Sequence, residues 1–196
     1  MSERVLIVGQ AAPEHVGAAF LSAARSAAID ATLADSTAAW AGGKLRQRLS
    51  FRLLGKRPTA LGTFSRRVVE LCREVRPSVL LSTGVAPVTH DALRAIGKLG
   101  VRRINYLTDD PWNPATGARY FWKSLREYDT IYSPRHANMN DLRAHGCGDV
   151  RFMPWAYNPE LHFPETAQND AERARYACDV AFVGGGDAGR VELVRP

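Results

Sequence analysis

Two neighbouring carboxylates and a histidine are, by type and position, the side chains of this sequence best suited to catalysis. Asp109 and Asp110 stand together in the stretch TDDPWNP, directly after an apolar run, and His15 follows the first apolar run of the chain. A carboxylate accepts hydrogen bonds from hydroxyl groups, and a carboxylate or an imidazole can also remove their protons. These residues predict a site for a hydroxyl-rich substrate, with Asp110, Asp109 and His15 as catalytic residues.

Each of the three also has a structural interpretation. His15 would be an exposed histidine in the first turn of a helix, and Asp109 would cap the turn that follows it. Asp110 precedes Pro111, which restricts it to extended geometry, so only one carboxylate is expected to face a cleft. A pair of aspartates supplies too few oxygen ligands for a hard cation, and no metal site is predicted.

Other groups at the ends of apolar runs are predicted to bind substrate. Trp112 would stack on a sugar ring or cover the edge of a sheet, and the loop between Gly9 and Gly17 would face the ligand. Ser133 ends a run and suits a helix cap as well, while His136 opens the next helix, where donors suit an anionic or polyhydroxy ligand. The first loop, GQAAPEHVGAAF, lacks the glycine spacing of dinucleotide and P-loop motifs, so no such cofactor is expected.

The elements that would position these residues alternate between short apolar runs and helical periodicity. Strands are predicted at RVLIVG, DATLAD, SVLLSTG, VRRINYLT, DTIYSP and VRFMP, over residues 4–9, 30–35, 78–84, 101–108, 129–134 and 150–154. Helices are predicted between them, one from about Glu14 and one capped by Thr63. This alternation predicts a Rossmann-like three-layer α/β/α domain with a mostly parallel sheet. Ligands bind such sheets at the carboxyl ends of the strands, where all the residues above stand.

Composition excludes several classes of protein. With 196 residues, of which 45% are apolar and 23% charged, the chain suits one α/β domain but not two full ones. No apolar run is long enough to span a membrane, and no secretory signal is visible. Cys72, Cys147 and Cys178 are far apart and read as reduced thiols, so a cytoplasmic protein is expected.

Positive charge is concentrated in one segment. The net charge is +6, and the stretch from Lys44 to Arg76 alone holds ten Lys or Arg residues against two Glu. From Lys44 to Arg57, leucines at helical spacing alternate with arginines. This segment suits a solvated face, an anionic membrane surface or the phosphate groups of an acceptor. Nucleic-acid binding is not expected, because few aromatic residues are interleaved.

The last part of the sequence changes character. Residues 1–154 are predicted to form the domain, residues 155–178 a connector, and residues 179–196 a fresh strand, a glycine-rich turn and the start of a helix. The strand from Asp179 to Gly184 would open a second domain or add an edge strand to the same sheet. A second domain would need a remainder outside these residues, or a partner subunit, to bury its apolar face.

Five motifs occur in one order over essentially the whole chain: VGQAAPEHVGAAF, NYLTDDPWNP, SPRHANMNDLRAHG, VRFMPWAYNPELHFP and DVAFVGG. This arrangement resembles the amino-terminal half of GT-B-fold glycosyltransferases, closest to the bacterial spore-maturation-protein (CgeB-like) glycosyltransferases. FMPWAYNPELHFP is similar to the inter-domain segment of that group, and DVAFVGG to the first strand of its nucleotide-sugar-binding domain.

The resemblance implies an enzyme of hexosyltransferase type that moves a sugar from a nucleotide sugar to an acceptor, without a further cofactor. This chain would be the acceptor-binding half, inactive in transfer by itself. Where similar enzymes often carry a histidine that touches the donor sugar, this sequence has Asp109 and Asp110. The donor would be held by the glycine turn and the arginine that follows it, namely Gly184, Gly185, Gly186 and Arg190.

Two other interpretations stay open. One is a single-domain, flavodoxin-like protein that binds a sugar or nucleotide without catalysis. The other is a peripheral protein that docks on the inner membrane face through the stretch from Lys44 to Arg57.

Overall fold

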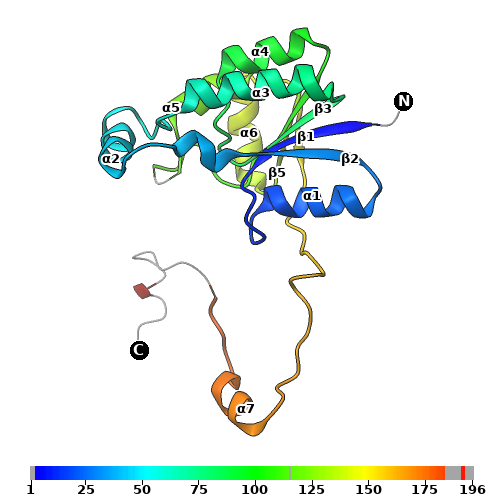
Figure 1. The fold of residues 1–196 in the computed structure, drawn as a ribbon. Helices are drawn as coiled ribbons and strands as arrows, with labels where there is room; N and C mark the ends of the chain where they lie inside the picture. The colour runs from blue at the N-terminus through cyan, green and yellow to red at the C-terminus, as the bar shows by residue number, and fades with distance from the viewer. Residues whose placement is uncertain (1–2, 115, 184–190, 193–196) are drawn as a thin grey trace. The chain divides into compact units, whose positions relative to one another are not determined.

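The computed structural model describes residues 3–114, 116–183 and 191–192, and the chain divides into two compact units, residues 1–156 and 157–196. The first unit is built on a parallel sheet of six strands (Figure 1). The strands are β1 (Arg4–Gly9), β2 (Asp30–Asp35), β3 (Val79–Thr83), β4 (Arg102–Tyr106), β5 (Thr130–Ser133) and β6 (Val150–Phe152). Their order is β2-β1-β3-β4-β5-β6, and every neighbouring pair is parallel.

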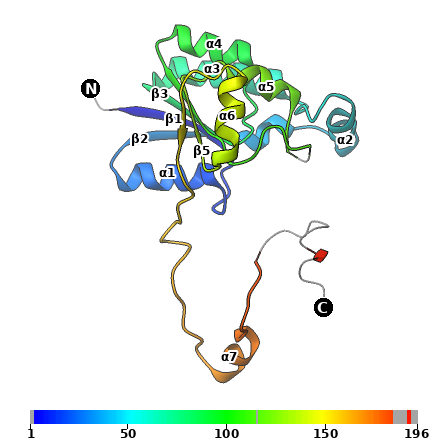
Figure 2. The ribbon, with the colours of Figure 1, turned by 180° about the vertical axis from the view of Figure 1, so that it is seen from behind.

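Helices cover both faces of this sheet. The helices of the first unit are α1 (Val16–Ser26), η1 (Ser36–Trp40), α2 (Lys44–Leu53), α3 (Leu61–Val75), α4 (His90–Lys98), α5 (Arg119–Leu125) and α6 (His136–Ala144). α1 packs on β1 and β2, on the opposite side of the sheet from α3 and α4 (Figure 1, Figure 2). A right-handed crossover from β1 to β2 runs in the opposite direction to those that follow, so it leaves its helix on the other face. The predicted three-layer α/β/α fold class is confirmed.

The core lies mainly between the sheet and the helices from α3 to α5. Central strands read as continuous apolar runs because both faces are covered, and Leu6, Ile7 and Val8 are at most 1% exposed. Phe121 and Leu125 of α5 are fully buried and belong to the same core cluster as Leu6 and Val8.

Most predicted elements are present, with shifted ends. β2 has its predicted bounds, whereas α1 begins at Val16 rather than at Glu14. α3 begins at Leu61, before the predicted cap at Thr63. Burial explains the earlier start, because Leu61 is 1% exposed and the additional turn packs its side chain into the core.

The second unit, taken by itself, contains the short helix α7 (Asp170–Tyr176) within the predicted connector. The side chain of Asn169 accepts from the N–H of Glu172 at 2.9 Å, and that glutamate accepts from the N–H of Gln168 at 2.8 Å. Residues 179–183 are exposed and form no strand, so the strand prediction is wrong for them. A strand needs a neighbour for its backbone hydrogen bonds, and the described residues of this unit offer none.

Among the described residues, no helix has both the length and the apolar character needed to cross a bilayer.

Candidate functional site

The carboxyl ends of β1, β2, β3 and β4 line a pocket of about 410 Å³. β1 and β3 are neighbours in the sheet, whereas β2 lies on the other side of β1, so strand order reverses between β1 and β3. Open α/β sheets bind their ligands at this reversal point. The pocket is lined by Gln10, His15, Val16, Gly17, Ser36, Trp40, Thr83, Gly84, Val85, Ala86, Pro87, Thr108, Asp109 and Thr116.

The segments around the pocket pack closely on one another at two glycines. A Cβ atom at Gly9 would lie 2.8 Å from the Cα of Gly17 and 2.6 Å from Oγ1 of Thr83. Gly84 has a φ of +60°, and a Cβ there would lie 2.9 Å from Oγ1 of Thr108. Larger residues would push these loops apart, so the glycines set how closely they approach. Gly17 lines the pocket, whereas Gly9 is not among its lining residues.

His15 directly precedes the first residue of α1. It is the N-cap residue in extended geometry, but its imidazole makes no capping hydrogen bond. Its backbone is used instead: the N–H donates to the carbonyl of Ala12 at 2.9 Å, and the carbonyl accepts from Ala19 at 3.1 Å. The imidazole is half-buried and lines the pocket, and it forms no hydrogen bond with the residues that the structure describes.

The two aspartates have different places. Asp109 lines the pocket, where one carboxylate oxygen accepts from the hydroxyl of Thr108 at 3.1 Å. Asp110 holds the loop together: its carboxylate accepts from the N–H of Trp112 at 2.9 Å, and its carbonyl from the hydroxyl of Thr116 at 3.0 Å. Asp109 is thus the carboxylate that a ligand in this pocket would meet.

Three other predicted substrate-binding residues do not line the pocket. Trp112 packs against the core, with its ring edge-on to His145 at 6.0 Å. Ser133 is fully buried and accepts from the N–H of Arg135 at 3.2 Å, which is a turn-capping role. His136 stacks on Phe152 with ring centres 3.8 Å apart. The predicted donor-binding residues Gly184, Gly185, Gly186 and Arg190 lie outside the described residues.

Several lining residues were missed by the sequence analysis. Ser36 directly follows a predicted strand, Thr108 is the last residue of another, and Thr83 is the last but one of a third. The rule that ligands bind at the carboxyl ends of parallel strands could therefore have identified them. Trp40 and Thr116 lie farther from any strand, and only the folding of their loops brings them to the pocket.

The lining mixes polar residues with apolar ones such as Trp40 and Val85, and it is almost uncharged. It combines hydroxyls of Ser and Thr, one amide, one imidazole and the carboxylate of Asp109, and no Lys or Arg is among its described residues. These hydroxyl, amide, imidazole and carboxylate groups can form hydrogen bonds with the hydroxyl groups of a ligand. Within the described part of the chain, no three His, Cys, Asp or Glu side chains are grouped to hold a metal ion.

Comparison with known proteins finds solved structures of similar fold but no match to a family model or to a curated protein. UDP-GlcNAc 2-epimerase from Neisseria meningitidis, solved with UDP-GlcNAc, is 14% identical over 76% of this chain and 45% of its own, with a TM-score of 0.51. S. aureus MnaA, solved with UDP, is 15% identical over 76% of this chain and 44% of its own, with a TM-score of 0.52.

This likeness shows a shared fold. The chain spans less than half the length of these two proteins. It has the Rossmann-like fold found in one half of such GT-B-type structures.

Proposed function

We propose that this chain is the acceptor-binding half of a glycosyltransferase that moves a sugar from a nucleotide sugar to a hydroxyl group. The observation that carries the proposal is the pocket at the strand reversal point, which His15 and Asp109 line together with hydroxyl groups of Ser and Thr. Such a lining can bind a hydroxyl-bearing acceptor and offers two groups that can act as its base.

In the proposed reaction, the acceptor hydroxyl attacks the anomeric carbon of the donor sugar. The new carbon–oxygen bond forms as the bond to the nucleotide diphosphate breaks, and the hydroxyl proton passes to His15 or Asp109. Thr108 orients the carboxylate of Asp109 through its hydroxyl. Asp110 acts indirectly, because it fixes the loop that carries Asp109.

The donor is proposed to bind outside the first unit. The solved structures with the same fold contain UDP-GlcNAc or UDP, which supports a nucleotide sugar as ligand of the whole protein. The order of sequence motifs, which resembles that of CgeB-like glycosyltransferases, also supports a nucleotide sugar as donor. The donor diphosphate would then meet Gly184, Gly185, Gly186 and Arg190.

The test is an assay of the native gene product with a panel of nucleotide sugars and hydroxyl acceptors, with the released nucleotide measured by chromatography. We expect His15→Gln and Asp109→Asn to lower transfer by about 100-fold or more, because each removes a candidate base. Asp141→Asn is the matched control, since Asp141 is exposed on α6 and does not line the pocket. Unchanged transfer in both pocket variants would exclude the assigned site.

A second candidate is a binding protein without catalysis. The first five strands have the order β2-β1-β3-β4-β5, which is that of flavodoxin-like domains. Calorimetry distinguishes the two proposals: a sugar that binds the first unit, with no nucleotide released from any donor, favours the binding protein.

A further inference from the structure

Helix α2 presents its leucines to solvent. Leu45, Leu49 and Leu53 recur at every fourth position and lie along one face of the helix, where they are 72%, 51% and 74% exposed. Ser50, on another face, is the buried residue of α2. A helix that packs on a core turns its apolar stripe inward, so α2 has the reverse orientation.

Polar contacts hold α2 in this orientation. The side-chain amide of Gln47 donates to the carbonyl of Trp40 and, at 3.0 Å, to that of Gly42. The hydroxyl of Ser50 donates to the carbonyl of Arg57 at 2.7 Å. Rotating the leucines inward would break these hydrogen bonds to the backbone.

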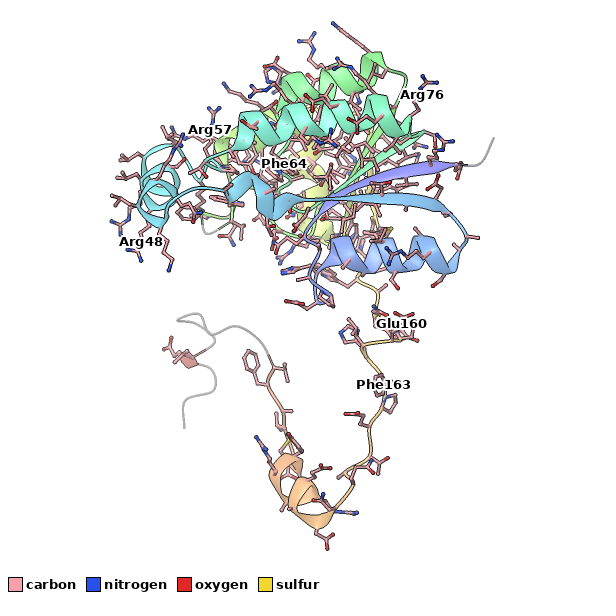
Figure 3. All side chains as sticks on the ribbon, in the orientation of Figure 1. Arg48, Arg57, Phe64, Arg76, Glu160 and Phe163 are labelled. Atoms are coloured by element: carbon pink, nitrogen blue, oxygen red, sulfur yellow. The ribbon has the colours of Figure 1, made fainter. Side chains whose placement is uncertain are left out.

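Cationic side chains flank the leucine row. Residues 44–57 contain six Lys or Arg residues and no Asp or Glu. At 100° per residue, Arg48 and Arg52 fall on one side of the leucines and Arg46 on the other. None of the six forms an ion pair within the part of the chain that the structure describes. Figure 3 shows Arg48 on α2 and Arg57 just beyond it, at the same end of the first unit.

We propose that α2 docks the protein onto the surface of an anionic phospholipid bilayer. The leucines would enter the boundary of the acyl chains, and the flanking arginines would pair with lipid phosphates. An acidic polymer could neutralise the arginines, but it would leave the leucine row in water. This proposal does not depend on the proposed enzymatic function.

The docking helix is connected to the pocket. Trp40 lines the pocket, accepts from Gln47 of α2 through its carbonyl, and has its ring 6.4 Å from that of Phe51. Docking through α2 would therefore bring the pocket near the lipid surface.

The test is co-sedimentation of the purified chain with two kinds of vesicle, phosphatidylcholine alone and phosphatidylcholine with phosphatidylglycerol. We expect binding to the anionic vesicles, weakened by high salt, and little binding to the neutral ones. Replacing Arg46, Arg48 and Arg52 together by Gln should lower the partition coefficient by about 100-fold, from roughly fivefold per cationic side chain. Replacing the three leucines by Ser should lower it by about 10-fold or more.

The control variant loses the same number of positive charges, but from helices other than α2. Arg25, Arg73 and Arg94 are exposed on α1, α3 and α4, and their joint replacement by Gln should leave vesicle binding unchanged. All replaced side chains are exposed, so each variant should keep the circular dichroism spectrum of the parent.

Three results would overturn the proposal. One is the absence of binding to anionic vesicles. Another is an equal loss of vesicle binding in the control variant and in the α2 arginine variant, which would indicate that only the net charge of the protein matters. The third is full binding by the leucine variant, which would indicate a polyanion surface such as one for nucleic acid.

Discussion

Gly9 and Gly17 touch through their backbones: a Cβ atom built on Gly17 would lie 2.9 Å from the Cα of Gly9 and 2.8 Å from the carbonyl oxygen of Gln10. This contact brings the end of β1 against the first turn of α1. It also places His15, two residues earlier, at the pocket.

Gly17→Ala should therefore destabilise the first unit by about 1–3 kcal/mol, because the added methyl group meets backbone atoms that cannot rotate away. Urea unfolding followed by circular dichroism measures the change. Gly148→Ala is the matched control: a Cβ there meets nothing within 4 Å, so its effect should stay within about 0.5 kcal/mol. Equal stability of the two variants would show that the loop yields without cost.

Substitutions of Asp109 and of Asp110 should change the free energy of unfolding by different amounts. Asp110→Ala removes the acceptor of the Trp112 N–H and should cost about 1 kcal/mol, whereas Asp110→Asn keeps an acceptor oxygen and should cost less. Asp109→Ala should stay within about 0.5 kcal/mol, because the one described hydrogen bond of its carboxylate comes from the hydroxyl of the half-buried Thr108. Thermal melts of the three variants decide this, and a large loss for Asp109→Ala would give that residue a structural role.

Asp129 should make the first unit sensitive to acid. Its carboxylate accepts from Nη2 of Arg103 at 2.6 Å and from Nε at 3.0 Å, and this guanidinium holds the pKa of Asp129 below its ordinary value. The pKa of Asp129 is lower in the folded chain than in the unfolded chain. The stabilisation by its pair with Arg103 is therefore complete above about pH 4, and it is lost as the pH falls through the pKa of the folded state.

Asp129→Asn should accordingly cost about 1 kcal/mol at pH 7, since the pair is partly exposed and screened, and it should flatten the decline in stability below pH 4. Urea unfolding at a series of pH values tests both effects. A variant with the same acid profile as the parent would assign that profile to other carboxylates.

The cysteines should react at different rates. Cys72 and Cys147 are buried, and burial raises the pKa of each thiol to about 11, so little thiolate forms at pH 8. Cys178 is exposed. A thiol reagent such as Ellman's should modify one cysteine rapidly and the other two only in denaturant, and Cys178→Ser should remove the rapid phase. Rapid modification of all three would mean that the first unit opens easily.

The sheet and its helices were predictable because their signals are local. A buried parallel strand needs consecutive apolar residues, as in Leu6, Ile7 and Val8, and a surface helix needs apolar residues at its own period. Both patterns lie within about ten residues of sequence. Residues 179–183 show where this reasoning fails, since an apolar run forms a strand only when a neighbour supplies hydrogen bonds.

The sequence alone thus determined the fold class and the loops in which the candidate site would lie. The tertiary structure decided which side chains meet there. Strand order, and with it the pocket, depends on the pairing of β1 with β3, whose residues are far apart in the chain. Asp109 rather than Asp110 is the candidate ligand-binding carboxylate because the carboxylate of Asp110 accepts a hydrogen bond from the N–H of Trp112. The outward leucines of α2 follow from the bonds of Gln47 and Ser50, because amphipathicity divides a helix into faces and only its neighbours select the buried one.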